Sequence, residues 1–488
     1  MTSLLSLDLL DTRLKPLCNA YLGSAQVPGA SIAVVAGDKG YHYAYGVKSI
    51  ATGEQVTAQT GFNIGSCSKS FVSATVASLV AEGLATWDDR IAKYVPEFQL
   101  YDPAITQQVT LRDLSGNRLG LPREGLAEMG FDPTLPSSHA FESLRYTQPS
   151  HPFRDRFTYV NPGHTANAVA AGRITGRGYL ATLRERILSP LGMNGTSGGV
   201  AARDELSDQA SWHTLIEGDV VGIDTVFTDH YLGSGGMVVP GIDALQWLRL
   251  QLNAGTVDHQ QIVARDALLE THMAHSAARP GKDLVSLIYP GAHLGSYALG
   301  WAVSDFEGHP LVCHSGSDLG VTAMTLLLPK AGIGIAVYCN LATGNTVSTA
   351  YALAATLLGL GPRDWDAYFA AMAPAPEAPT STERSPALSD PGPYLGIYRH
   401  PADGPLVIER SGNNLQGNLT NGYRMAFTLV PEDEHRFEFR FSQHEWQASA
   451  SRLKIGLVFT VIGGLAEKVE VVGGPCNGRI FDRVEETP

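Results

Sequence analysis

The residues best suited to do chemistry lie in one short stretch, 62–70, with the sequence FNIGSCSKS. Ser66 and Lys69 are three positions apart, so on a helix they lie one above the other within side-chain reach. In the run that follows, 71–81, apolar or small side chains lie on nearly every face, which is typical of a buried helix. Burial and the positive end of the helix dipole both disfavour the ammonium form of Lys69. Such a lysine can act as a base for the neighbouring hydroxyl.

A second stretch, RFTYVNPGH, places Tyr159 and Asn161 just before a predicted helix. A phenol there could shuttle a proton, and an amide could hydrogen-bond a carbonyl or orient the lysine. Each residue has an ordinary alternative, since Tyr159 could pack in a core and Asn161 could cap the helix. The same holds for the first stretch, where Ser66 could cap the helix while Lys69 extends to solvent.

A third stretch, LVCHSGSDLG, places His314, Gly316 and Ser317 at the end of an apolar strand. Glycine lets a substrate backbone approach closely, and the amide of Ser317 could donate to an oxyanion. His314 could equally be a satisfied histidine at a strand end. The chemistry therefore depends on whether the fold brings these three stretches together.

Length and charge limit the classes of protein to which the chain can belong. At 488 residues it is longer than one hydrophobic core usually grows, so more than one domain is expected. A net charge of -13 argues against a nucleic-acid binder. No stretch approaches the roughly 20 apolar residues needed to cross a bilayer. The N-terminal stretch lacks the positive segment of a signal peptide, so a cytoplasmic protein is predicted.

The hydrophobic pattern predicts the elements that must position the three stretches. Segments 30–49 and 324–341 are β-rich runs broken by glycine turns, and helical stretches lie between them. This order predicts an α+β domain whose chain returns to complete one antiparallel sheet, with the site between that sheet and the helices. The helices are expected over 66–82, 164–175, 179–190, 243–254 and 346–358.

The chain changes character after residue 362. Residues 363–391 are rich in Pro and Ala and are predicted to be a linker. The remainder alternates short apolar runs with polar turns, the pattern of a small antiparallel β-barrel. We therefore expect a first domain over 1–362 and a barrel domain over 392–488.

Taken in order, the three stretches resemble the three motifs of the penicillin-recognising serine hydrolases, which include class C β-lactamases, DD-carboxypeptidases, D-aminopeptidases and related esterases. The resemblance covers about residues 10–360. It implies a β-lactamase/transpeptidase-like fold, an antiparallel sheet flanked by helices with a helical subdomain. The tail, which opens with YLGIY, resembles the lipocalin-like barrel that some peptidase-type members carry. The motifs are Ser66-x-x-Lys69, Tyr159-x-Asn161 and His314-Ser315-Gly316.

The resemblance implies catalytic roles for three residues. Ser66 would be the acylated nucleophile, and Lys69 and Tyr159 would share the proton transfers. The chemistry would be double displacement through an acyl-enzyme, with no metal and no cofactor.

The resemblance also implies roles in binding. Asn161 would hold the catalytic lysine or the substrate amide, and His314 would bind the substrate or its carboxylate. The amides of Ser66 and Ser317, beside Gly316, would form the oxyanion hole. Class A and C β-lactamases usually have Lys at the first position of the third motif, so His314 lowers the expectation of a dedicated β-lactamase.

A second departure lies near the predicted cleft. Residues 114–122 have the sequence LSGNRLGLP where relatives often have LLSHTSGL, so this wall is expected to differ. Substrate choice is expected to depend on the 117–145 and 276–296 loops.

Three functions remain open. The first is an amide or peptide hydrolase, D-aminopeptidase or carboxypeptidase-like, acting on small-molecule or short-peptide substrates. The second is a carboxylesterase or transacylase with the same Ser66, Lys69 and Tyr159. The third is an inactive binder of β-lactams or peptidoglycan fragments, against which the intact catalytic residues argue. A homo-oligomer is also open, because apolar strands in an appended barrel would suit subunit contacts.

Overall fold

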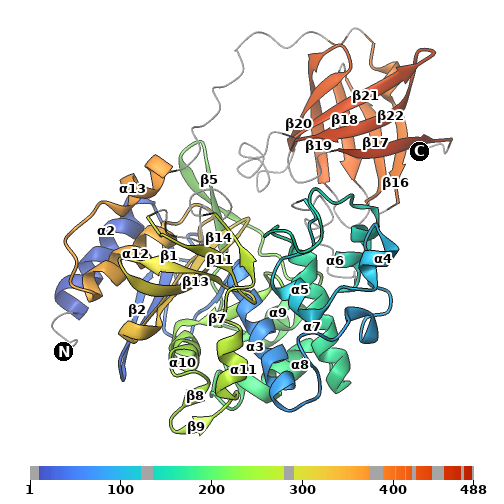
Figure 1. Cartoon of the computed structure of the whole chain (residues 1–488). Coiled ribbons are helices and arrows are strands. Elements are labelled where there is room, and N and C mark those ends of the chain that lie inside the picture. The colour runs from blue at the N-terminus through green and yellow to red at the C-terminus, as the bar shows by residue number, and fades with distance from the viewer. Residues whose placement is uncertain are drawn as a thin grey trace.

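The chain forms an α+β body followed by a β-barrel (Figure 1). No helix among the residues described below is long and apolar enough to span a membrane. The structure is a computed structural model that describes residues 10–122, 136–279, 289, 291–372, 388, 390–401, 403–412, 414–419, 425–441, 455–473 and 478–485.

The centre of the α+β body is an eight-stranded antiparallel sheet with the order β10-β11-β12-β13-β14-β15-β1-β2. Two distant parts of the chain meet in it, because β1 (Gly29–Ala36) pairs with β15 (Ile333–Cys339). Every residue of both strands is buried, so helices cover them on both faces. The predicted return of the chain to complete one sheet is confirmed. The other strands are β2 (Lys39–Gly46), β10 (Ser276–Ala277), β11 (Gly295–Tyr297), β12 (Ala302–Phe306), β13 (His309–Asp318) and β14 (Val321–Leu328).

Two helical layers pack on this sheet, and β1 shows why. Its side chains alternate, with Ile32 and Val34 facing one core and Ala33 and Val35 facing the other. The first face carries α2 (Lys15–Ser24), α12 (Thr346–Leu357) and α13 (Trp365–Met372). The second carries α3 (Ser68–Ala81) and α10 (Gly241–Leu252), beyond which the helical subdomain lies (Figure 1).

Beyond the central sheet and its covering helices, the α+β body contains short helices and small two- and three-stranded sheets. The helices are α4 (Pro103–Thr106), α5 (Leu111–Ser115), α6 (His139–Glu142), α7 (Asn161–Thr175), α8 (Tyr179–Leu183), α9 (Gly199–Glu205) and α11 (Arg265–Glu270). The strands are β3 (Gly61–Asn63), β4 (Ser197–Gly198) and β7 (Met237–Pro240), β5 (Trp212–Ile216) and β6 (Asp219–Ile223), and β8 (Thr256–Val257) and β9 (Gln260–Gln261).

Helix α3 is buried from Ser68 to Leu79, as its all-round apolar pattern predicted. It ends where Gly83 adopts a φ of +72° and the N–H of Leu84 donates to the carbonyl of Leu79 at 3.0 Å. The other four predicted helices are also found. They differ at their ends, because α7 begins at Asn161 and α8 passes into a π-helical turn, Arg184–Leu188.

The C-terminal part is a closed antiparallel barrel, which confirms the predicted small lipocalin-like barrel. It closes because its last strand pairs with its first, with Ile397 opposite Val484. Its interior is filled by large apolar side chains, among them Phe427 and Phe439, whose rings stack at 3.7 Å. The strands are β16 (Gly396–His400), β17 (Gly404–Ser411), β18 (Asn414–Leu419), β19 (Met425–Asp433), β20 (Arg436–Phe441), β21 (Gly456–Ile462), β22 (Leu465–Val472) and β23 (Arg479–Val484).

The predicted linker, 363–391, begins with a helix instead. Helix α13 occupies its first residues, and Trp365 is buried against Tyr351 of α12. Aromatic residues give this helix an apolar face that a composition rich in Pro and Ala concealed. Most of the remaining linker lies outside the described residues, and the domain limits stay predictions.

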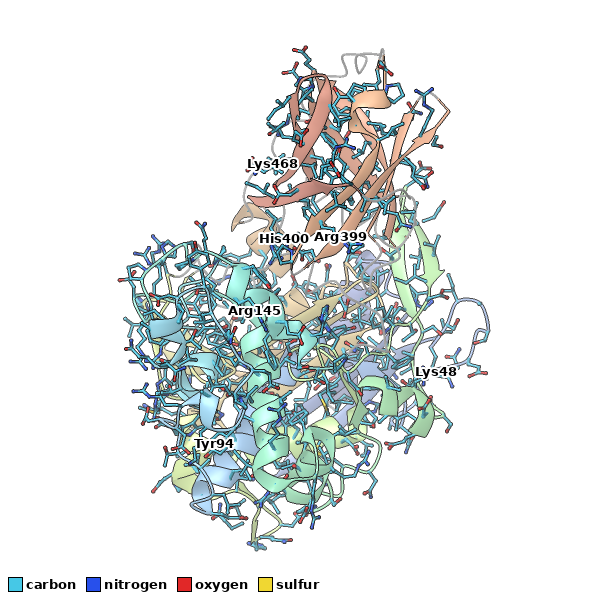
Figure 2. The ribbon with its side chains drawn as sticks, turned by 90° about the vertical axis from the view of Figure 1, so that its right-hand side faces the viewer. Lys48, Tyr94, Arg145, Arg399, His400 and Lys468 are labelled. Carbon is cyan, nitrogen blue, oxygen red and sulfur yellow. The ribbon has the colours of Figure 1, made fainter. Side chains whose placement is uncertain are left out.

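Among the described residues, the barrel contacts the α+β body through both apolar and polar side chains. Leu319 and Val321, at the turn between β13 and β14, join the apolar cluster of the barrel. On the helical side, Arg479 donates to the hydroxyl of Thr147 at 3.4 Å. In Figure 2, His400 lies at the end of the barrel nearest the segment that carries Arg145.

A buried carboxylate ties the subdomain together. Asp113 is fully buried and accepts from Thr110 Oγ1 at 2.8 Å, Arg118 at 2.6 Å and Arg154 at 2.7 Å. Burial alone would raise its pKa, but the hydrogen bonds from Arg154 and Thr110 hold that pKa below its usual value. Arg154 lies just before Tyr159 in the chain, so the carboxylate fixes the approach to the second motif.

We expect Asp113→Asn to lower the free energy of unfolding by about 3 kcal/mol at pH 7, because it leaves two guanidinium groups without their buried partner. Since the folded pKa is depressed, the carboxylate stabilises the protein above the ordinary pKa of about 4, and this contribution is lost as the pH falls through the folded value. Urea unfolding at pH 7 and between pH 5 and 3 measures both effects.

The matched control is Asp88→Asn, which removes the exposed partner of Arg112 and should cost about 0.5 kcal/mol or less. Equal losses of unfolding free energy in the two variants would contradict the stabilising role of Asp113. So would an Asp113→Asn variant that loses as much stability between pH 5 and 3 as the wild type does.

Candidate active site

Ser66 lies on a single 3-10 turn, Gly65–Cys67, immediately before α3. The turn is held from both ends, because Asn63 Oδ1 accepts from the N–H of Gly65 at 2.8 Å. The hydroxyl of Ser68 donates to the carbonyl of Gly65 at 2.6 Å and accepts from the N–H of Met237 at 3.0 Å. Ser66 therefore precedes the α-helix that was predicted to contain it, and its side chain is only half-buried.

The structure brings three of the predicted residues together. Ser66 Oγ accepts hydrogen bonds from Lys69 Nζ at 2.8 Å and from Tyr159 Oη at 2.7 Å. Lys69 has no exposed surface, and its Nζ also donates to the carbonyl of Ser234 at 2.7 Å. The same Nζ lies 4.8 Å from the centre of the Tyr159 ring. Either neighbour is close enough to exchange a proton with Ser66.

Asn117 fixes the segment that carries Tyr159. Its carbonyl accepts from the N–H of Thr158 at 3.0 Å, and its Oδ1 accepts from the N–H of Val160 at 2.8 Å. Asn117 is buried and holds a φ of +53°, a conformation that asparagine tolerates better than most residues. Sequence analysis did not assign it a role, although it lies inside the stretch 114–122 that departs from the family pattern.

Asn161 is half-buried at the start of α7, and its Oδ1 is enclosed with no hydrogen-bond partner in the part of the chain that the structure describes. The predicted hold of Asn161 on Lys69 through this oxygen is therefore not found. An enclosed acceptor without a donor is costly, and a ligand N–H would satisfy it. The alternative prediction, a bond to a substrate amide, stays open.

Two glycines bring the 3-10 turn that bears Ser66 against the end of β13. A Cβ on Gly316 would lie 2.0 Å from the carbonyl oxygen of Ile64 and 3.0 Å from the nitrogen of Ser66. A Cβ on Gly65, which has a φ of +48°, would lie 2.6 Å from the nitrogen of Ser317. Only glycine fits this contact, and the amide nitrogens of Ser66 and Ser317 both lie at it. Two convergent amides are what an oxyanion hole requires.

His314 is almost fully buried, at 1% exposure, and both of its ring nitrogens are engaged. Nδ1 lies 2.6 Å from the carbonyl of Ser315, which can only accept, so Nδ1 carries the hydrogen. Nε2 therefore accepts from the hydroxyl of Tyr297 at 3.0 Å. Burial, and then the nearby Lys69, lower the pKa of His314 to about 3. The ring is neutral, so the predicted role of binding a substrate carboxylate is not supported.

A second buried histidine lies behind the site. His164, on α7, approaches Asn117 Nδ2 with its Nε2 at 3.4 Å. Burial, Lys69 and His314 keep its pKa well below the ordinary value. The rings of His164 and His314 flank Tyr297, with centroids 6.4 and 5.8 Å away. Sequence analysis missed both Tyr297 and His164, whose positions relative to the site depend on tertiary contacts.

The predicted specificity loops are only partly described. Residues 123–135 of the first loop, and 280–288 and 290 of the second, lie outside the described residues. Across the described chain, no group of three or more His, Cys, Asp or Glu side chains could hold a metal ion.

Comparisons with known proteins agree with this architecture. A family model described as Beta-lactamase matches residues 14–360. The chain is 24% identical over 428 residues to "Unguisins hydrolase ungD'" of Aspergillus campestris, which covers 82% of this chain and 78% of that protein. It is 24% identical over 331 residues to "Protein flp" of Staphylococcus aureus, which covers 66% of this chain and 61% of that protein.

Two solved structures share the fold over nearly the whole chain. An octameric penicillin-binding protein homologue from Pyrococcus abyssi superposes with a TM-score of 0.63 at 20% identity, covering 97% of this chain and 100% of that one. The crystal structure of SurE gives a TM-score of 0.59 at 20% identity, covering 97% and 98%. The β-lactamase/transpeptidase-like fold is thereby confirmed.

We expect Asn117→Ala to slow the reaction of Ser66 with a fluorophosphonate by roughly 10- to 100-fold, because Tyr159 loses its fixed position and proton transfer typically contributes factors of this size or more. The rate of labelling, followed by mass spectrometry in protein that thermal unfolding shows to be folded, measures the effect.

The control is Asn167→Ala, which removes a buried amide that bonds Leu111 and Ser115 and does not contact Tyr159. It should cost similar stability and leave the labelling rate within about twofold. If both variants slow labelling equally, the effect comes from a general loss of packing in this region, and Asn117 has no specific role in positioning Tyr159.

Proposed function

Because the chain belongs to the Beta-lactamase family, a family of serine hydrolases, we propose that it hydrolyses amide or peptide bonds of small substrates through an acyl-enzyme on Ser66. One observation carries the proposal: the Oγ of Ser66 lies within hydrogen-bond distance of both Lys69 Nζ and Tyr159 Oη. A serine hydroxyl is a weak nucleophile, and two adjacent proton carriers give its proton a destination.

In the proposed acylation, Ser66 Oγ attacks the substrate carbonyl, and its proton passes to Lys69 when that residue is in its free-amine form or, through Tyr159, to the leaving group. The carbonyl oxygen takes negative charge between the amides of Ser66 and Ser317. Collapse of this intermediate breaks the carbon–nitrogen bond, and the leaving amine departs with a proton supplied by Tyr159 or Lys69. Water then attacks the acyl-enzyme by the same proton path in reverse and restores the serine.

The open acceptor of Asn161 supports an amide substrate. Its enclosed Oδ1 lies on the residue that begins α7, two positions after Tyr159, and could accept from the N–H of a substrate amide. Esters lack such a donor at the cleaved bond. The carboxylesterase or transacylase alternative uses the same acyl-enzyme, and the leaving group distinguishes it.

The neutral state of His314 argues against substrates anchored by a carboxylate. A carboxylate needs a cation or several donors to replace its water shell, and the ring nitrogens of His314 are already engaged. We therefore favour peptides cleaved away from a free C-terminus over β-lactams and over a carboxypeptidase activity.

We expect Ser66→Ala and Lys69→Ala each to lower kcat/KM by about 10³-fold or more on p-nitroanilides of amino acids and short peptides, and Tyr159→Phe by roughly 10²- to 10³-fold. Steady-state kinetics on purified, folded variants give these ratios. Full activity in Ser66→Ala would refute the proposal, and turnover of p-nitrophenyl esters alone would favour the esterase.

Ser70→Ala is the matched control for these variants. It removes a hydroxyl from the same helix that donates only to the carbonyl of Cys67, at 2.7 Å, so kcat/KM should change by about twofold or less. A large loss in this variant would show that the assay responds to damage of α3 as such.

We also expect peptides with an amidated C-terminus to be cleaved at least as fast as the same peptides with a free carboxylate, because His314 supplies no cation. Paired kcat/KM values on one sequence in its two forms test this. A tenfold or greater preference for the free acid, which corresponds to about 1.4 kcal/mol, would restore the carboxypeptidase alternative.

A further inference from the structure

One face of strand β13 lies against the 3-10 turn that bears Ser66. That face also carries the carboxyl group of Asp318, which none of the three motifs includes. Alternate residues of a strand share a face, so His314, Gly316 and Asp318 lie on the same side. Gly316 on this face lies against Ser66. Asp318 follows by one repeat, roughly 7 Å further along the strand.

Asp318 is held in place by neutral donors. Its Oδ1 accepts from the N–H of Leu319 at 2.8 Å, and its carboxyl group also accepts from the hydroxyl of Tyr231. Among the described residues no Lys, Arg or His forms an ion pair with Asp318. Within the part of the chain that the structure describes, its donors are therefore neutral groups and not cations.

Tyr231 connects this carboxyl group to the catalytic lysine. Its carbonyl accepts from the N–H groups of Ser234 and Gly235, both at 2.8 Å. The carbonyl of Ser234 in turn accepts from Lys69 Nζ at 2.7 Å. A Cβ on Gly235 would lie 3.1 Å from the Tyr231 ring and 3.9 Å from the carbonyl carbon of Gly65. Asp318 is thus fixed relative to both the lysine and the turn that bears Ser66.

The surroundings make the charge of Asp318 costly without a ligand. Burial raises its pKa to about 6, so the group is mostly ionised at pH 7 but is poorly solvated. On one side Leu319 packs into the apolar cluster of the barrel. As a residue Asp318 is only half-buried, so part of it is open to a small ligand.

From this geometry we propose that Asp318 binds the ammonium of substrates that carry a free α-amino group, so that it is a specificity-determining residue. The inference rests on the proposed hydrolysis at Ser66. A substrate carbonyl oxygen between the amides of Ser66 and Ser317 places the α-carbon beside the end of β13. The α-nitrogen is one bond further, on the face that Asp318 shares with Gly316.

Asp318 and the neutral His314 select for the same kind of substrate. The third motif offers no cation for a carboxylate, and four residues later the same strand offers a carboxylate for a cation. The two features together favour release of an N-terminal residue from a short peptide or amide.

The test compares two anilides that differ only in the amine, alanine p-nitroanilide in its D- and L-forms and propionyl p-nitroanilide. We expect the wild type to prefer an alanyl substrate, and Asp318→Asn to lower the ratio of kcat/KM for alanyl over propionyl by about 10- to 100-fold, mainly through KM, as for loss of a hydrogen bond to a charged group. Asp318→Glu should restore part of the ratio.

The matched control is Asp305→Asn on β12, which removes a carboxylate that bonds His293 and lies opposite Pro310 at the far end of β13. It should leave the ratio within about twofold. An unchanged ratio in Asp318→Asn, or a wild type without preference for the alanyl compounds, would overturn the proposal even when Ser66→Ala is inactive on both substrates. Activity in Ser66→Ala would instead overturn the proposed hydrolysis and this inference with it.

Discussion

The whole site depends on the burial of one lysine. Lys69 has no exposed surface, and a buried amine must find acceptors for its N–H groups. Two of them are the hydroxyl of Ser66 and the carbonyl of Ser234, which come from different elements. Helix α3 buries the lysine, the 3-10 turn before it presents the serine, and the loop before β7 supplies the carbonyl. Loss of any one would leave a polar group unsatisfied in the core.

The groups around this lysine carry little positive charge. His164 and His314 both have pKa values lowered by burial and by Lys69 itself, and Tyr297 joins their neighbourhood through its hydroxyl. A charged imidazole at either position would repel the ammonium form of the lysine. The neutral His164 and His314 instead pack in the core and form directed hydrogen bonds. Asp318 is then the charged group on this face of β13.

Some of the site could be predicted from the sequence because its geometry is local. Ser66 and Lys69 are related by helical spacing, and the all-round apolar pattern of α3 already implied burial. That Tyr159 and β13 lie beside this turn could be predicted only from the family resemblance, because local sequence patterns do not reveal distances between segments far apart in the chain. Asn117 was missed since its contacts with Val160 and His164 join positions more than 40 apart in the chain. The predicted role of His314 stays a prediction, because residue type does not reveal protonation, which burial decides.

The proposed reaction requires that Ser66 carry the acyl group during turnover. The most direct measurement is intact-protein mass spectrometry of the wild type, quenched in acid within seconds of mixing with a p-nitrophenyl ester or an aminoacyl p-nitroanilide, followed by peptide mapping. We expect a mass increase equal to the acyl group on the peptide that contains Ser66, and none in Ser66→Ala. An adduct on another residue, or turnover at the wild-type rate by Ser66→Ala, would contradict it.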